Sequence, residues 1–207
     1  MSGAQGRSSI WANGWSQNSY WLDGLGDAPH TDGALPVEAD VVIIGSGYTG
    51  LNAAIECARG GKSTLVLEAG DPGHGCSTRN GGQISTSIKP SLERLQAKHG
   101  RERGKAIRDA GQEALNWIET RISTEGLDCG FKRVGRFHAA HSAAAYEELC
   151  RTSETLRRNE DIESFAVSRG EQHAELGSDF YHGGVVYPRH ASVDPARYHR
   201  GLLAAAL

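Results

Sequence analysis

A glycine-rich turn at residues 45–50 is the feature that most constrains how this chain folds. It follows Val41–Ile44, a run of β-branched apolar residues, and it precedes residues 51–58, where apolar side chains recur at helical spacing. Residues 64–68 then read as a second strand, so a right-handed strand–helix–strand unit with parallel strands is expected. We expect the first strand to be buried on both faces of its sheet.

The three glycines of this GxGxxG pattern each have a separate mechanical role. Gly45 permits a tight turn out of the strand, Gly47 lets the backbone approach a diphosphate, and Gly50 lets the helix lie close to the strand. The helix N-terminus adds unpaired N–H groups and the positive end of a dipole. Against the alternative of a glycine-rich turn without a ligand, the pattern favours a dinucleotide site that comprises Gly45, Ser46, Gly47, Tyr48, Thr49 and Gly50.

Glu68 ends the second strand, at the position where a carboxylate accepts hydrogen bonds from the hydroxyls of an adenosine ribose. The same negative charge repels a 2′-phosphate, which disfavours NADP. We therefore add Glu68 and the adjacent Ala69 to the predicted cofactor site.

A glycine-dense segment with interleaved polar side chains, residues 73–84, follows the second strand. Such a segment can lay backbone N–H groups along a cofactor and direct short donors toward its phosphates. A nicotinamide-type domain would instead continue through an ordinary connection to a third strand, so the segment favours FAD. A flexible surface loop is the alternative that composition leaves open.

The run ADVVIIGSGYTGLNAAIECARGGKSTLVLEAG, followed by GCSTRNGGQIS, resembles the N-terminal part of the D-amino-acid-oxidase-like FAD-dependent oxidoreductases. Within that family it is most similar to the branch of gamma-glutamylputrescine oxidoreductase and the glycine and sarcosine oxidases. The resemblance implies an FAD, held by the glycine turn at its pyrophosphate and by Glu68 at its ribose. No motif marks His74 or Cys76 as an attachment point, so we expect the FAD to be noncovalent. It also implies that the phosphates and the flavin lie beside Ser77, Arg79, Asn80, Gly81, Gly82 and Gln83.

For function, the resemblance implies oxidation of the C–N bond of an amine or amino acid, of the gamma-glutamylputrescine, glycine or sarcosine kind, to an imine that hydrolyses. No catalytic residue is assigned. His182, Tyr187 and Arg189 fall in the expected substrate domain, but such residues also finish strand ends. Two alternatives stay open: a truncated, non-catalytic remnant of such an enzyme, and an NAD-dependent dehydrogenase that uses the same glycine turn.

Further along the chain, the apolar pattern predicts a long amphipathic helix over residues 91–125, with a break near Gly100 or Gly104. The remaining elements expected are a strand or hairpin over 129–139, a helix over 142–158, a strand over 179–187, and a helix that Asp194 caps and Pro195 begins.

The expected fold class is α/β, with a Rossmann-like FAD-binding domain and the beginning of an α+β substrate domain. The expected divisions are an N-terminal arm (1–36), the first part of the FAD-binding domain (37–128), the first part of the substrate domain (129–190) and a return helix (191–207). The last helix carries an apolar stripe, Tyr198, Leu202, Leu203 and Ala206, for which no covering elements are expected. The chain therefore reads as truncated, and by itself it is expected to bind FAD weakly or not at all.

Composition narrows the partners. The chain has 22 Lys and Arg against 25 Asp and Glu, so no basic surface for nucleic acid is indicated. Its apolar runs are far shorter than the roughly 20 residues that cross a bilayer, and its first residues lack a secretory signal, so a cytoplasmic protein is expected. Scattered cysteines and histidines argue against a disulfide framework and a metal site. A small-molecule amine is the expected partner, and the oligomeric state is not indicated.

The N-terminal arm contains four aromatic residues, Trp11, Trp15, Tyr20 and Trp21. We expect them to pack against the body of the protein or a neighbouring subunit rather than to bind a ligand.

Overall fold

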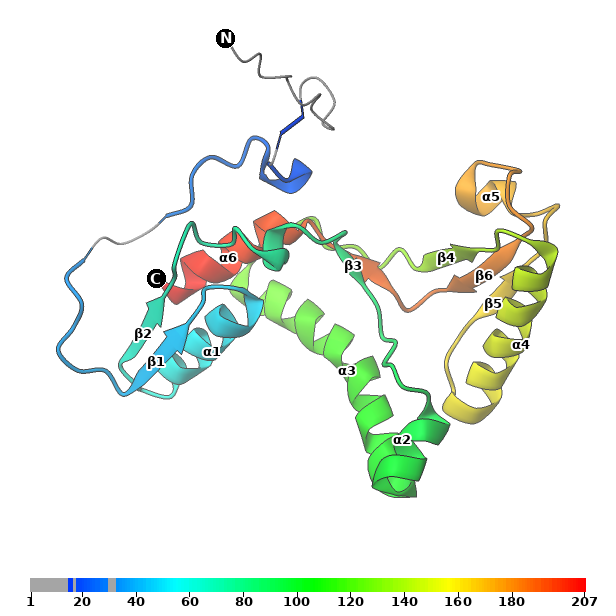
Figure 1. The fold of residues 1–207 in the computed structure, drawn as a ribbon, viewed down its shortest axis with the longest axis horizontal. Helices are drawn as coiled ribbons and strands as arrows, with labels where there is room; N and C mark the ends of the chain where they lie inside the picture. The colour runs from blue at the N-terminus through cyan, green and yellow to red at the C-terminus, as the bar shows by residue number, and fades with distance from the viewer. Residues whose placement is uncertain (1–14, 17, 30–32) are drawn as a thin grey trace, which may run out of the picture.

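The structure is a computed structural model that describes residues 15–16, 18–29 and 33–207. Figure 1 shows two lobes, with a long helix and a short strand pair between them. The first lobe contains the glycine turn, and the second contains a three-stranded antiparallel sheet.

The first lobe is built on the predicted strand–helix–strand unit. Strand β1 (Val41–Ile44) pairs in parallel with β2 (Thr64–Leu67), and helix α1 (Tyr48–Arg59) joins them. α1 buries Leu51 and Ile55 in the core of this lobe.

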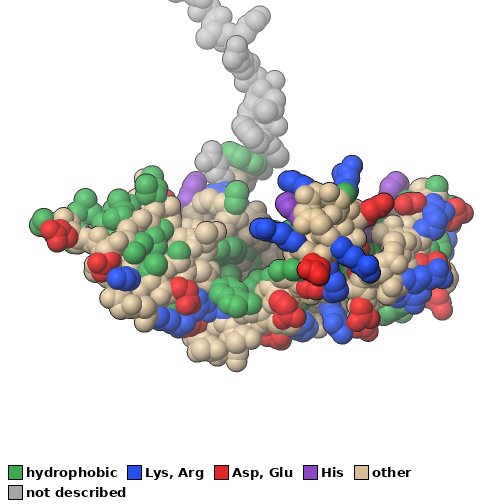
Figure 2. Space-filling model, turned by 90° about the horizontal axis from the view of Figure 1, so that it is seen from below, with side chains coloured by type: hydrophobic (Ala, Val, Ile, Leu, Met, Phe, Trp, Pro, Cys, Tyr) green, Lys and Arg blue, Asp and Glu red, His purple; other side chains and the backbone are tan. Residues whose placement is uncertain are grey.

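The expectation that β1 is buried on both faces is wrong. The side chains of Val42 and Ile44 are 54% and 89% exposed, because no described element covers the face of the sheet opposite α1. Figure 2 shows hydrophobic side chains gathered at this end of the molecule.

Helix α6 (Pro195–Ala206) lies on α1 and begins as its sequence predicts. The Asp194 carboxylate caps it by accepting hydrogen bonds from the amides of Ala196 and Arg197, both at 3.0 Å, and Pro195 occupies the first turn.

The apolar stripe of α6 is covered, contrary to expectation. Tyr198, Leu202 and Leu203 are buried in one cluster with Leu51 of α1 and Ile122. The stripe packs on helices that precede it in the chain. The stripe therefore gives no ground for expecting weak FAD binding, and that expectation stays a prediction.

The predicted long helix is broken at one of the two expected glycines. Helix α2 (Leu92–His99) ends at Gly100, whose φ of +82° favours glycine, and α3 (Arg101–Glu125) begins directly after it. The two helices approach closely at Gly104, where a Cβ would lie 2.6 Å from the backbone nitrogen of Gln96.

The second lobe is a sheet of three antiparallel strands in the order β4–β6–β5, with one long helix beside it. Its strands are shorter than the sequence predicts, since the expected strand over 129–139 forms only at its end. The elements are β4 (Arg136–Ala139), α4 (Ala143–Glu160), β5 (Phe165–Val167), α5 (His173–Leu176) and β6 (Gly184–Tyr187). A short antiparallel pair, β3 (Gln83–Ile84) with β7 (Ala191–Ser192), lies between the lobes.

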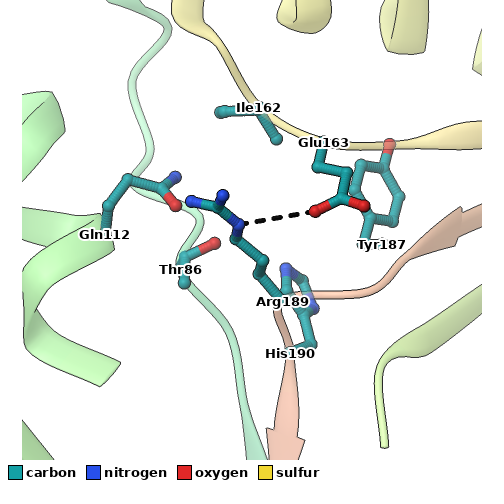
Figure 3. A pocket seen from close by; sticks show the side chains of 7 residues that line it. All are labelled: Thr86, Gln112, Ile162, Glu163, Tyr187, Arg189 and His190. Carbon is teal, nitrogen blue, oxygen red and sulfur yellow. Dashed lines mark ion pairs between the residues drawn. The ribbon is translucent and has the colours of Figure 1, made fainter. Parts of the chain in front are cut away.

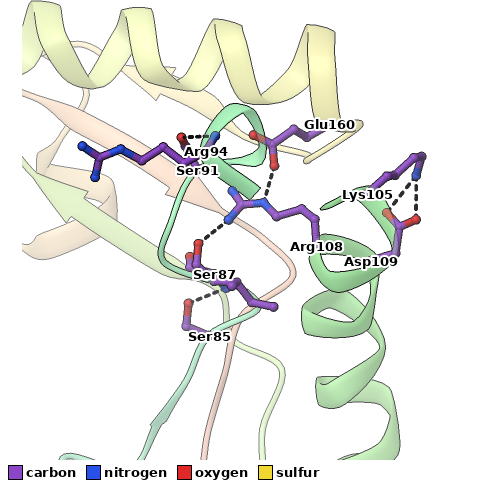
Figure 4. A network of polar contacts seen from close by, with 9 residues as sticks. Ser85, Ser87, Ser91, Arg94, Lys105, Arg108, Asp109 and Glu160 are labelled. Carbon is purple, nitrogen blue, oxygen red and sulfur yellow. Dashed lines mark hydrogen bonds and ion pairs between the residues drawn. The ribbon is translucent and has the colours of Figure 1, made fainter. Parts of the chain in front are cut away.

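A buried ion pair joins α3 to the second lobe (Figure 4). The guanidinium of Arg108 donates to the carboxylate of Glu160 at the end of α4, and the two side chains are 10% and 7% exposed. A second nitrogen of Arg108 donates to the carbonyl of Ile88, in the segment after β3. Because either charge alone would be costly to bury, this contact fixes three segments relative to one another.

The N-terminal arm contacts the body of the protein near the segment after β2. A short 3-10 helix, η1 (Tyr20–Leu22), begins after Ser19, whose hydroxyl donates to the carbonyl of Thr78 at 2.8 Å. The indole of Trp21 donates to the carbonyl of Asn80 at 2.8 Å.

Of the other aromatic residues of the arm, Tyr20 and Trp15 stay exposed, and Trp11 lies outside the described residues.

Cys57, Cys76, Cys129 and Cys150 are free thiols. Among the helices in the described part of the chain, none is long and apolar enough to cross a membrane.

Candidate functional site

The glycine turn leaves β1 at the carboxyl edge of the two-stranded sheet. Gly45 has a φ of +95°, which favours glycine, and its amide donates to the carbonyl of Leu67 at 2.7 Å. A Cβ on Gly50 would lie 2.0 Å from the Gly45 carbonyl oxygen and 3.3 Å from Cγ2 of Ile43. This geometry agrees with the tight turn and the close helix–strand contact that the sequence predicts for these two glycines.

Backbone amides at the start of α1 are open to a ligand. Gly47 is the N-cap of this helix and supplies no side-chain cap. Within the described residues, the amides of Gly47, Thr49 and Gly50 have no hydrogen-bond acceptor, while the Tyr48 amide donates to Oγ of Ser77 at 3.2 Å. Uncapped amides at a helix N-terminus bind anions, and the Ser77 hydroxyl can donate its proton to the same anion.

The carboxylate of Glu68 lies against the glycine turn. Oε2 accepts from the amide and the hydroxyl of Ser46 at 2.8 and 2.7 Å, and Oε1 accepts from the Ala69 amide at 2.9 Å. These bonds, those from Ser46 above all, hold the pKa of Glu68 below its ordinary value of 4.5, so the group is ionised at neutral pH. A third amide, that of Gly70, lies 3.4 Å from Oε1, so this hydrogen bond is long and weak. A sugar hydroxyl can therefore take the place of the Gly70 amide at Oε1.

Two residues of segment 73–84 contact the turn through Tyr48. Oγ of Ser77 accepts from the Tyr48 amide, and the side chain of Asn80 forms a hydrogen bond with the Tyr48 hydroxyl. That hydroxyl also donates to the carbonyl of Pro195 at 2.9 Å, and burial raises the pKa of Tyr48 to about 12. Gly81 lies in open space, with no atom within 4 Å of where a Cβ would stand.

The other predicted residues of this segment make contacts outside the glycine turn. The Arg79 side chain turns back on its own loop, where Nε donates to the His74 carbonyl at 2.6 Å. Gly82 has a φ of +69° and approaches the chain so closely that a Cβ would lie 2.1 Å from the Val193 carbonyl oxygen. Gln83 belongs to β3. Gly82 and Gln83 join β3 to β7, while Ser77 and Asn80 contact the glycine turn.

His199 of α6 contacts the turn as well, although the sequence pattern does not single it out. It is fully buried, and its Nε2 lies 2.7 Å from the carbonyl oxygen of Ser46. The two residues are 153 positions apart, so no local spacing signals the contact.

A narrow crevice lies where α3, the segment after β3 and the second lobe meet (Figure 3). The Arg189 side chain lies between Gln112 and Glu163 in that view, with its Nε 3.5 Å from Oε2 of Glu163. Burial lowers the pKa of His190 and raises that of Tyr187, so both side chains are neutral at pH 7. The crevice is lined by Thr86, Gln112, Ile162, Glu163, Tyr187, Arg189 and His190.

Of the three residues considered for the substrate domain, Tyr187 and Arg189 therefore lie together in this crevice. His182 is not among the residues that line it.

Comparison with known families matches residues 40–207 to DAO, the FAD dependent oxidoreductases. This chain belongs to that family. The resemblance predicted from the glycine turn is thereby confirmed, as are the FAD-type α/β fold and FAD as the cofactor of the family.

Curated relatives agree with the branch that the sequence indicates. A probable oxidoreductase, OrdL, of Haemophilus influenzae is 28% identical over 172 residues, which are 82% of this chain and 39% of that protein. The gamma-glutamylputrescine oxidoreductase of Escherichia coli is 30% identical over 154 residues, 72% of this chain and 35% of that protein. The chain thus spans little more than a third of the length of these relatives.

Solved structures share the fold at lower identity. L-amino acid deaminase from Proteus vulgaris superposes with a TM-score of 0.67 at 21% identity, over 87% of this chain and 45% of that one. Glycine oxidase from Geobacillus kaustophilus gives a TM-score of 0.61, also at 21% identity, over 81% and 44% of the two chains.

The residues at the turn fit the ADP half of FAD. The uncapped amides of Gly47 and Thr49 suit a diphosphate, and a Cβ on Gly47 would stand 3.1 Å from the Ser77 hydroxyl, inside the same cradle. An ionised, exposed carboxylate on Glu68 suits a ribose.

Proposed function

We propose that this protein is a flavoenzyme that oxidises the C–N bond of a small amine or amino acid, and that this chain supplies the site for the ADP half of FAD. The observation that carries the proposal is the uncapped N-terminus of α1 beside the ionised Glu68, in a chain of the FAD-dependent family.

In this proposal the amides of Gly47, Thr49 and Gly50 hold the diphosphate, together with the Ser77 hydroxyl. Glu68 accepts from the ribose hydroxyls through Oε1, while its Oε2 keeps the bonds to Ser46. The segment Arg79–Gln83 continues beyond the phosphates on the flavin side. What supports this assignment is the free hydrogen-bonding capacity of the turn.

FAD, when bound, supplies the acceptor for the hydride removed from the carbon next to the substrate nitrogen. The task of the protein is to hold the cofactor, to orient the amine and to exclude water. The imine formed then hydrolyses to a carbonyl compound and an amine or ammonia. The names of the relatives make gamma-glutamylputrescine and glycine the first substrates to test, with sarcosine as the N-methyl analogue of glycine.

The test has two stages, since cofactor binding and catalysis are separate claims. In the first, the purified protein is incubated with FAD and dialysed, and bound flavin is read from its visible absorbance. In the second, the loaded protein is mixed with each amine without oxygen, and loss of the oxidised flavin absorbance is followed. Loss with at least one amine supports the whole proposal.

Retained flavin that none of the amines bleaches would instead support a non-catalytic protein that binds FAD. Protein that retains no flavin would contradict the first stage and the cofactor site with it.

A further inference from the structure

His199 is held at the glycine turn by a buried hydrogen bond. Its ring is 0% exposed, and Nε2 lies 2.7 Å from the carbonyl oxygen of Ser46. A carbonyl only accepts, so Nε2 carries the proton. Nδ1 is buried without a partner among the described residues, which favours the singly protonated ring. Burial also lowers the pKa of His199, in agreement with a neutral ring.

The ring has little freedom to move. It lies against Gly73, where a Cβ would stand 2.6 Å from Cε1 and 2.7 Å from Nδ1. Gly73 itself has a φ of +81°. Glycine is therefore favoured at this position both by the backbone conformation and by the lack of room for a Cβ. The position of Nε2 is therefore set by the packing of the ring against Gly73 and by the hydrogen bond to Ser46.

The carbonyl of Ser46 belongs to the same planar peptide unit as the amide of Gly47. In a trans peptide the C=O and N–H bonds point in opposite directions. Since His199 bonds the carbonyl from the α6 side, the Gly47 N–H points away from α6. Ser46 is also fixed through its amide, which donates to Glu68 at 2.8 Å. Both peptide units that flank Ser46 are therefore anchored.

We propose that His199 is a positioning residue that aims the Gly47 amide at the diphosphate of the cofactor. The inference rests on the proposed function, because it concerns the affinity of that same site. It means that the nucleotide site is complete only when α6 is packed on the first lobe. It also separates two contributions: His199 acts on the diphosphate, and Glu68 acts on the ribose.

Two substitutions in the full chain test this role. Gln at position 199 keeps a donor at the same number of bonds from the backbone, whereas Met fills the space without one. We expect His199→Met to weaken ADP binding about tenfold, the usual effect of losing one buried hydrogen bond, and to leave adenosine binding unchanged. We expect His199→Gln to restore most of the ADP affinity. Titration calorimetry with ADP and with adenosine measures both.

Equal losses for ADP and adenosine in His199→Met would show a general structural defect and overturn the inference. Unchanged ADP affinity would overturn it as well. If the wild-type chain bound neither ligand, the proposed function would fail together with the inference. A wild-type chain that binds ADP while His199→Met also binds it normally leaves the proposed function intact.

One readout needs neither ligand nor variant. Nitrogen NMR of the ligand-free protein should show His199 with its proton on Nε2 and in slow exchange with water. A proton on Nδ1 would contradict the hydrogen bond to Ser46, and so the inference, even if His199→Met did not fold.

Discussion

Substitution of Arg108 by Met should destabilise the protein strongly, because it leaves the buried carboxylate of Glu160 without its partner. Both side chains of this pair are at most 10% exposed, and the Ile88 carbonyl loses its donor too. Breaking a buried pair on one side costs about 3 to 5 kcal/mol. With a urea dependence of about 2 to 3 kcal/mol per M, the unfolding midpoint should fall by about 1 to 2.5 M. Urea unfolding followed by circular dichroism measures this shift.

The matched control is Arg151→Met, which removes an arginine whose pair with Glu148 is on the surface. Those two side chains are 64% and 68% exposed, so the loss should stay below about 1 kcal/mol. A double variant, Arg108→Met with Glu160→Met, should recover much of the stability, because no buried charge remains unpaired. A loss for Arg108→Met as small as for Arg151→Met would refute the reasoning, as would a double variant no more stable than the single one.

Three further outcomes are expected. Gly50→Ala should lower the free energy of unfolding, measured in urea, by about 1 to 3 kcal/mol, because its Cβ would lie 2.0 Å from a backbone carbonyl oxygen. The control Gly75→Ala, which has open space around its Cβ, should lower it by less than about 0.5 kcal/mol. Ser77→Ala should weaken FAD about threefold to tenfold in equilibrium dialysis, and an unchanged affinity would remove Ser77 from the site. Burial lowers the pKa of His138 and His190 from 6.5, so protonating them destabilises the folded protein. The free energy of unfolding should therefore be highest above about pH 6.5 and fall as the pH drops below it. Equal urea midpoints at pH 8 and pH 5.5 would contradict this expectation.

Local signals predicted the elements that position the site. The β-branched run before Gly45 gave β1, the break at Gly100 divided the long helix, and Asp194 with Pro195 began α6. Each of these follows from backbone chemistry within a few residues: the freedom of glycine at positive φ, the fixed φ of proline, and a carboxylate that accepts from helix amides.

What the sequence could not predict depends on contacts between distant segments. An apolar run shows that a strand can be buried, but not which of its faces is covered, and Ile44 is exposed. The apolar stripe of α6 does not show by itself that the residues packed against it come from helices earlier in the chain. The contact of His199 with Ser46 and the pairing of Arg108 with Glu160 join residues 153 and 52 positions apart, beyond any periodicity.

The central claim is that the turn after β1 and the carboxylate of Glu68 together hold the ADP half of FAD. Titration calorimetry of the full chain with FAD, ADP and FMN tests it most directly, because FMN carries the flavin and one phosphate but lacks the adenosine and the second phosphate. We predict that ADP binds and competes with FAD, that FMN does not bind, and that Glu68→Gln weakens ADP about tenfold through the lost charge-assisted bonds to the ribose. FMN that binds as tightly as FAD, or an ADP affinity that Glu68→Gln leaves unchanged, would contradict the account.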